Sequence, residues 1–222
     1  MEFELGSMSD CHRTEPRDRT ESEAGAALIM ALLVLAGLVV IGLAGLAMAD
    51  VERLAALNDA RAVSVGYAAD AGLERTVRDL AQAPDWSLVL ARFQPSSMFD
   101  ADPRPMSPWG TRLDIAGMTG ELQRDTDRSD GAWADRSAWG VYLSGPLAKM
   151  MPGDAREVWP YVAAWVADDP ADADGNPGAD TNKVLRIHVT ALGPGGMRAE
   201  REAVVDRAPT DVVRVRAYWE PR

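Results

Sequence analysis

The feature that most constrains this chain is an apolar run from Ala24 to Ala49 that contains no charged residue. A hydrocarbon core about 30 Å thick needs roughly 20 apolar residues in an α-helix, so this run can cross a membrane with some tilt. A secretory signal has a shorter apolar region and then a cleavage site. Here good helix formers continue without proline as far as Ala83. The run therefore predicts a membrane-spanning helix that continues beyond the bilayer.

The residues beyond the bilayer keep a helical period up to Pro84, which stops a helix. The apolar and small residues at this spacing are Leu54, Leu57, Val65, Ala68, Ala69, Gly72, Leu73, Val77 and Leu80. We therefore predict one continuous helix, with a transmembrane half over residues 26–49 and an amphipathic half over 50–83 that packs against a folded domain.

Charge and cysteine content narrow the classes of partner. The 222 residues carry a formal net charge of −11. An acidic surface repels phosphate backbones, so we expect no nucleic-acid binding. The single cysteine, Cys11, precedes the apolar run, which argues against an internal disulfide or a cysteine-based metal site. Residues 1–7 read either as a cloning remnant or as native sequence.

Arginines flank the apolar run on both sides. Arg13, Arg17 and Arg19 precede it, whereas Arg53 and Arg61 follow it. Basic residues close to a span favour the cytoplasmic side, so this bias favours a cytoplasmic leader and a domain on the other side of the membrane. The plain interpretation is a single-pass membrane protein with an extracytoplasmic domain.

Several stretches resemble PilX-like minor pilins of the type IV pilin-like superfamily. They are "EAGAALIMALLVLAGLVVIGLAGLAMAD" (23–50) and "YAADAGLERTVRDLA" (67–81), where Asp70 replaces the usual glutamate, and in the last third "WVADDPADADGNPGAD", "LGPGGMRAEREAVV" and "VRVRAYWE". The resemblance implies an α+β, pilin-like fold, in which the long N-terminal helix packs on a C-terminal antiparallel β-sheet.

The resemblance also implies processing of a leader at residues 1–25. A prepilin peptidase would cut between Gly25 and Ala26, and Ala26 would become the N-methylated first residue. Met30 then occupies the fifth mature position, where most major pilins carry a glutamate that pairs with a neighbour's amine, because a charge in lipid needs a partner. Its absence is typical of PilX-type minor pilins and GspK-type pseudopilins, both thought to lie at the fibre tip. The alternative is that Met30 is an ordinary lipid-facing residue.

The region 141–222 predicts an antiparallel sheet. In "VLRIHVTAL" (184–192), apolar residues alternate with Arg186, His188 and Thr190, which marks a half-buried strand. The stretches "WGVYLSG", "WPYVAAWVADD" and "DVVRVRAYWEPR" read as further strands. Three or four strands would have one polar face and one apolar face covered by the amphipathic helix. The preceding region 84–140 reads as loops, including "QPSSMFDADPRPMSPWG" and "GELQRDTDRSDGAW".

One segment, "ADDPADADGNPGADTN" (167–182), has residues suited to metal binding. Ca²⁺ accepts six to eight oxygen ligands, and the candidates are Asp168, Asp169, Asp172, Asp174, Asn176 and Asp180. The EF-hand pattern is broken, because Pro177 and Lys183 stand at the positions of its glycine and glutamate. A looser calcium site that uses Asp168 or Asp169 with Asp180 is one interpretation, and a solvated acidic turn is the other.

Enzyme motifs are missing from the sequence. There is no nucleophile elbow or phosphate loop, and after cleavage one histidine, His188, and no cysteine would remain. We therefore predict that the protein is not an enzyme. The tryptophans are explained by core packing or subunit contacts, with sugar binding as the alternative.

Together these features predict a structural minor pilin at the tip of a type IV pilus, which primes assembly and supports adhesin display. The expected partners are other minor and major pilins through the N-terminal helix, the prepilin peptidase and a large tip adhesin. Before assembly it would span the inner membrane with its C-terminal domain in the periplasm, and afterwards it would be extracellular. The alternatives are a GspK-like pseudopilin of type II secretion and a plain anchored binding domain. GspK-type proteins usually carry a large helical insertion, and the segment 85–140 is too short and polar to be one, which favours the pilus.

Overall fold

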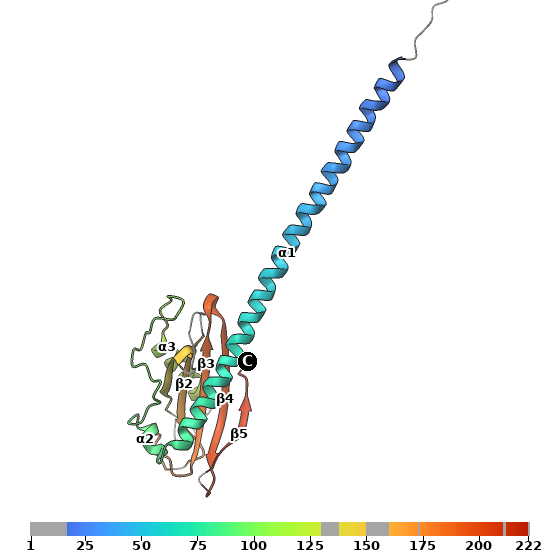
Figure 1. Cartoon of the computed structure of the whole chain (residues 1–222). Coiled ribbons are helices and arrows are strands. Elements are labelled where there is room, and N and C mark those ends of the chain that lie inside the picture. Colours follow the sequence, from blue (N-terminus) through green and yellow to red (C-terminus); the bar gives the residue numbers. More distant parts are fainter. Residues whose placement is uncertain (1–16, 130–137, 150–159, 173, 211, 222) are drawn as a thin grey trace, which may run out of the picture. The chain divides into compact units, whose positions relative to one another are not determined.

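The computed structural model describes residues 17–129, 138–149, 160–172, 174–210 and 212–221 (Figure 1). The chain divides into two compact units, Met1–Ala56 and Leu57–Arg222. Helix α1, Arg17–Gln82, contributes to both units. It begins before the predicted start at Ala26 and ends two residues before Pro84, whose ring is incompatible with a continuing helix.

In the first unit, α1 is exposed from Gly25 to Ala56, and its residues carry no charge as far as Ala49. By length and composition this helix is apolar enough to cross a membrane. A run of exposed leucine, valine and isoleucine side chains is unfavourable in water, so it needs lipid or protein to cover it.

The second unit is an α+β domain, as predicted. Within the described residues, one antiparallel sheet has five strands in chain order: β1 (Gly140–Pro146), β2 (Tyr161–Asp168), β3 (Val184–Leu192), β4 (Arg198–Arg207) and β5 (Val213–Trp219). The sequence predicted three or four strands. Charged residues on both faces of "RAEREAVVDR" hide the alternation in β4.

The C-terminal part of α1 packs on one face of this sheet. The buried helix residues include Val65, Ala69 and Leu80, which share a core with β2 and β3. Leu54 and Leu57, predicted for the same stripe, are instead 62% and 43% exposed. Helical spacing indicates which side of a helix is apolar, and it does not indicate how much of the helix length a sheet will cover.

Polar contacts fasten α1 within its docked stretch and at its C-terminal end. Asp70 accepts hydrogen bonds from Arg201 Nε (2.6 Å) and from the Tyr218 hydroxyl (3.0 Å). Near the C-terminus, Arg207 Nη2 donates to the carbonyl of Leu80 (2.8 Å). The last carbonyls of a helix have no partner within it, so a guanidinium there satisfies acceptors and complements the helix dipole.

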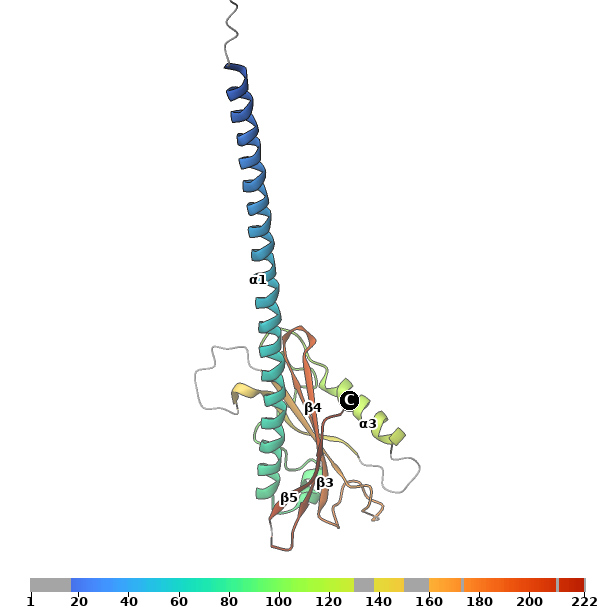
Figure 2. The ribbon, with the colours of Figure 1, turned by 90° about the vertical axis from the view of Figure 1, so that its right-hand side faces the viewer.

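The prediction of loops over 84–140 was wrong for two segments, α2 (Trp86–Leu90) and α3 (Ile115–Ser129). Asp114 precedes α3, and its Oδ1 accepts a hydrogen bond from the backbone N–H of Gly117 (3.0 Å), which satisfies a free donor of the first turn. Figure 2 shows α3 on the side of the sheet away from the C-terminal part of α1.

Helix α3 packs against β2 on the second face of the sheet. The indole Nε1 of Trp165 donates to Thr119 Oγ1, and that of Trp139 donates to Thr126 Oγ1, both at 2.7 Å. All of β2 is buried as a result, and His188 on β3 is only 5% exposed. The prediction of a solvent-exposed polar face is therefore wrong for β2 and β3, because α3, a helix that the sequence did not predict, lies over this face.

Candidate functional site

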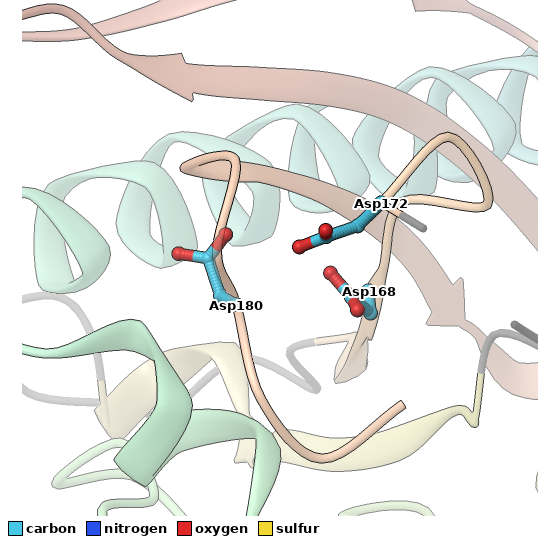
Figure 3. Close-up of side chains that lie close together, drawn as sticks. All are labelled: Asp168, Asp172 and Asp180. Carbon is cyan, nitrogen blue, oxygen red and sulfur yellow. The ribbon is translucent and has the colours of Figure 1, made fainter. Parts of the chain in front are cut away.

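Three of the predicted calcium ligands meet where β2 connects to β3. Asp168 ends β2, Asp172 lies in the following turn, and Asp180 lies on the returning limb of the connection (Figure 3). One carboxylate oxygen of each residue lies within 4.8 Å of the other two. Three like charges at this separation repel one another unless a cation or a proton lies between them.

Asp172 ties the two limbs of this connection together. Its Oδ1 accepts a hydrogen bond from the Thr181 hydroxyl, and its Oδ2 accepts from the backbone N–H groups of Thr181 (2.7 Å) and Asn182 (3.2 Å). Hydrogen bonds to a carboxylate favour its charged form. They lower the pKa of Asp172, with the Thr181 hydroxyl as the main cause.

Asp168 has the opposite shift. Its side chain is fully buried, and burial raises its pKa to about 7, with repulsion from Asp172 and Asp180 adding to the effect. Burial also raises the pKa of Asp180, whose Oδ1 accepts from the backbone N–H of Lys183 (2.7 Å). The cluster therefore supplies hard oxygen donors of the kind that hold Ca²⁺, and binding would require Asp168 to be ionised.

The other three predicted ligands lie outside the cluster and shape the turn. Asp169 Oδ2 accepts from the Asn182 side-chain amide (3.3 Å), and Asp174 Oδ1 accepts from the backbone N–H of Asn176 (2.8 Å). Asn176 Oδ1 in turn accepts from the backbone N–H of Gly178 (3.1 Å). Such local hydrogen bonds are common for aspartate and asparagine in turns.

The residues of the predicted cleavage site lie in α1. Gly25 and Ala26 are exposed, and a Cβ added at Gly25 would meet nothing within 4 Å. Met30 is 67% exposed within the apolar run. Residues 1–16 of the predicted leader, with Cys11, lie outside the described residues.

A cleft of about 840 Å³ lies between α3 and strands β3 and β4, and the sequence reading did not find it. His188 is in its floor: Nδ1 lies 2.9 Å from Glu202 Oε1, and Nε2 lies 3.2 Å from Thr190 Oγ1. The imidazole also meets the rings of Trp139 and Trp165 edge-on, with centroids 6.2 Å and 5.7 Å away. These contacts together fix the orientation of the His188 ring.

The order of hydroxyl, imidazole and carboxylate is that of a hydrolytic triad. Thr190 is fully buried, however, so a substrate carbonyl cannot reach its hydroxyl. The hydrogen bonds instead set the shape of the cleft floor. The sequence signal was the alternation in β3 that puts His188 and Thr190 on one face. That Glu202 lies beside His188 depends on the register between β3 and β4.

Comparison with known proteins does not assign the chain to a family: no family model, no curated protein and no solved structure matches it.

Proposed function

We propose that the chain is a PilX-like minor pilin, a structural subunit at the tip of a type IV pilus that primes assembly and supports adhesin display. The observation that carries this proposal is α1, in which an exposed apolar run continues into a stripe buried on an antiparallel sheet. Such a helix anchors a subunit in a membrane before assembly. In a fibre, neighbouring helices would cover the same apolar side chains.

The segment that resembles the family is also the segment that docks the helix. Asp70 pairs with Arg201. Gly72 allows the helix to approach the sheet closely, because a Cβ there would lie 2.5 Å from Val162 Cγ1. A physical role for both residues in joining helix to sheet supports the resemblance.

Met30 supports a position at the tip. A thioether cannot neutralise a buried amine, and an unpaired charge in an apolar environment is costly. A subunit with methionine at this position is therefore best placed where it has no neighbouring amine to neutralise.

Leader processing tests the proposal. The full chain is expressed with and without a prepilin peptidase, and its intact mass is measured. We expect loss of residues 1–25 and an added methyl group on Ala26. Gly25→Leu should block the cut, whereas Gly37→Ala should not, because Gly37 is also exposed in α1 with nothing within 4 Å of an added Cβ. An uncut chain, or a cut near Asp50, would contradict the proposal and favour a plain anchored domain.

The position of α3 favours one second candidate, a GspK-like pseudopilin. Those proteins usually carry a large helical insertion, and α3, which the sequence did not predict, is a helix of 15 residues that lies between α1 and β1 along the chain. Complementation separates the two candidates. Restored pili in a strain that lacks its PilX-like subunit would support a minor pilin, and restored secretion alone in a strain that lacks its GspK-like subunit would support a pseudopilin.

A further inference from the structure

The cleft between α3 and the sheet has a helical wall and a strand floor. Glu121, Asp125 and Ser129 line it from α3, one helical turn apart. His188 of β3 and Glu202 of β4 form part of the floor as a directly paired, hydrogen-bonded couple. The two tryptophan–threonine hydrogen bonds hold α3 in place over the sheet. Contacts within the domain therefore define the walls of the cleft.

Negative charge exceeds positive charge in this cleft. Its lining includes five carboxylates and three arginines. Each arginine already has a neighbour that engages it: Arg198 pairs with Glu200, Arg201 with Asp70 and Glu220, and Arg186 lies over the ring of Trp139. Arg198 and Arg201 are therefore paired within the domain, and so are the carboxylates of Glu200 and Glu220.

The acidic side chains of α3 are the most available. Among the described residues, the side chain of Glu121 forms no hydrogen bond or ion pair. Asp125 pairs with Arg128 one turn away, and both of these side chains are more than half exposed. Exposed pairs of this kind contribute little and are easily replaced by another cation. A cationic group that enters the cleft would therefore find carboxylates to pair with.

Apolar atoms lie beside these carboxylates. Met118 and Leu122 line the cleft from α3, and Ala199 and Pro221 line it from the strand side. Arginine and lysine side chains combine an aliphatic stem with a charged head. The cleft offers contacts to both parts of such a side chain.

The edge of β4 favours an extended chain as the ligand. Strand β5 pairs with β4 over residues 202–207. Glu220, which follows β5, lies beside Arg201 (3.1 Å), and no described strand pairs with the outer side of Arg198–Arg201. A volume of about 840 Å³ is also more than one cation fills. We propose that the cleft binds an extended segment of a partner protein that carries arginine or lysine, with a basic side chain next to Glu121 and Asp125. This proposal goes beyond the proposed function and does not depend on it.

Peptide binding to the full chain in detergent micelles tests this proposal. The probe is a capped hexapeptide of alternating glycine and arginine, and the comparison peptides carry glutamine or glutamate in place of arginine. By isothermal titration calorimetry we expect the arginine peptide to bind about tenfold more tightly than the glutamine peptide, and less tightly as salt increases. Equal binding of the arginine and glutamine peptides, or tighter binding of spermidine than of the arginine peptide, would overturn the proposal.

Charge variants on α3 locate the binding site. Glu121→Arg should weaken binding of the arginine peptide about tenfold, and Glu121→Gln about threefold. Asp127→Asn is the matched control, because Asp127 lies on the same helix and outside the cleft lining. We expect it to change affinity less than twofold. If Asp127→Asn weakens binding as much as Glu121→Gln does, the effect reflects net charge and the proposal fails.

Discussion

Gly72 is the residue at which one added methyl group tests the docking of α1 most directly. In the substitution Gly72→Ala, the new Cβ would lie 2.5 Å from Val162 Cγ1 and 3.0 Å from Val189 Cγ1. Both valines are fully buried, and β-branched side chains have few alternative rotamers. The helix would therefore have to move away from the sheet, or the valines would have to adopt strained conformations.

Two opposing effects set the magnitude. Overpacking a core costs about 1–3 kcal/mol, and contacts this short on fully buried side chains argue for the upper end of that range. Alanine is favoured over glycine in a helix by about 1 kcal/mol. We therefore expect Gly72→Ala to lower the free energy of unfolding by about 2 kcal/mol, which corresponds to a fall in melting temperature of about 4–8 °C for a unit of this size.

The same helix supplies a matched control. At Gly66 an added Cβ would have only an ordinary contact, 3.7 Å from Arg201 Nη2. Gly66→Ala should therefore raise stability by about 0.5–1 kcal/mol through helix propensity alone. Thermal unfolding followed by tryptophan fluorescence measures both variants, because every tryptophan of the chain lies in Leu57–Arg222.

A double variant examines the cause of the loss. Val162→Ala removes the methyl group that lies closest to the new Cβ, so Gly72→Ala should cost less in that background than in the wild type. If Gly72→Ala is as stable as the wild type, or if Val162→Ala does not reduce its cost, the close packing at Gly72 does not constrain the helix and this reasoning is refuted.

Three further predictions concern polar groups. Because the pKa of Asp168 is raised to about 7 on folding, the folded state holds the proton more tightly. The stability that this residue contributes is therefore complete below pH about 4 and is lost as the pH rises towards 7. In chelator, Asp168→Asn should remove this part of the pH dependence of the melting temperature, whereas Asp127→Asn, on α3, should leave it unchanged. Millimolar Ca²⁺ above pH 7 should raise the melting temperature of the wild type and should leave the melting temperature of Asp168→Asn unchanged. If Ca²⁺ shifts neither melting temperature, the cluster is a plain acidic turn. Arg207→Met removes the guanidinium that donates to the carbonyls of Leu80, Ala83 and Pro84, and should lower the unfolding free energy by about 1–2 kcal/mol in guanidinium titrations, with an unchanged midpoint as the contrary result.

The sequence predicted the elements that have a strong period. The apolar run and the stripe after it predicted α1, and alternation predicted most of the sheet. Helix α3 was missed because Gly117 and Gly120 and the charged residues of its outer face weaken the apolar signal. The signal that remained was the capping residue Asp114 followed by Ile115 and Leu122 at helical spacing.

The two sites differ in how far sequence could predict them. Asp168, Asp172 and Asp180 belong to one short connection, so their proximity follows from the local chain. The His188 cleft brings together α3, β3 and β4. Its position depends on strand register and on the face that α3 covers, and neither follows from local spacing.

The two arginines that fasten α1 have a mechanical consequence. Arg201 holds Asp70, Arg207 holds Leu80, and both arginines belong to β4. Part of a pulling force along α1 would therefore enter the sheet through β4, at Asp70 and at Leu80. Because β4 has β3 along its length and β5 beside residues 202–207, such a force would shear many hydrogen bonds at once and would not peel away an edge strand.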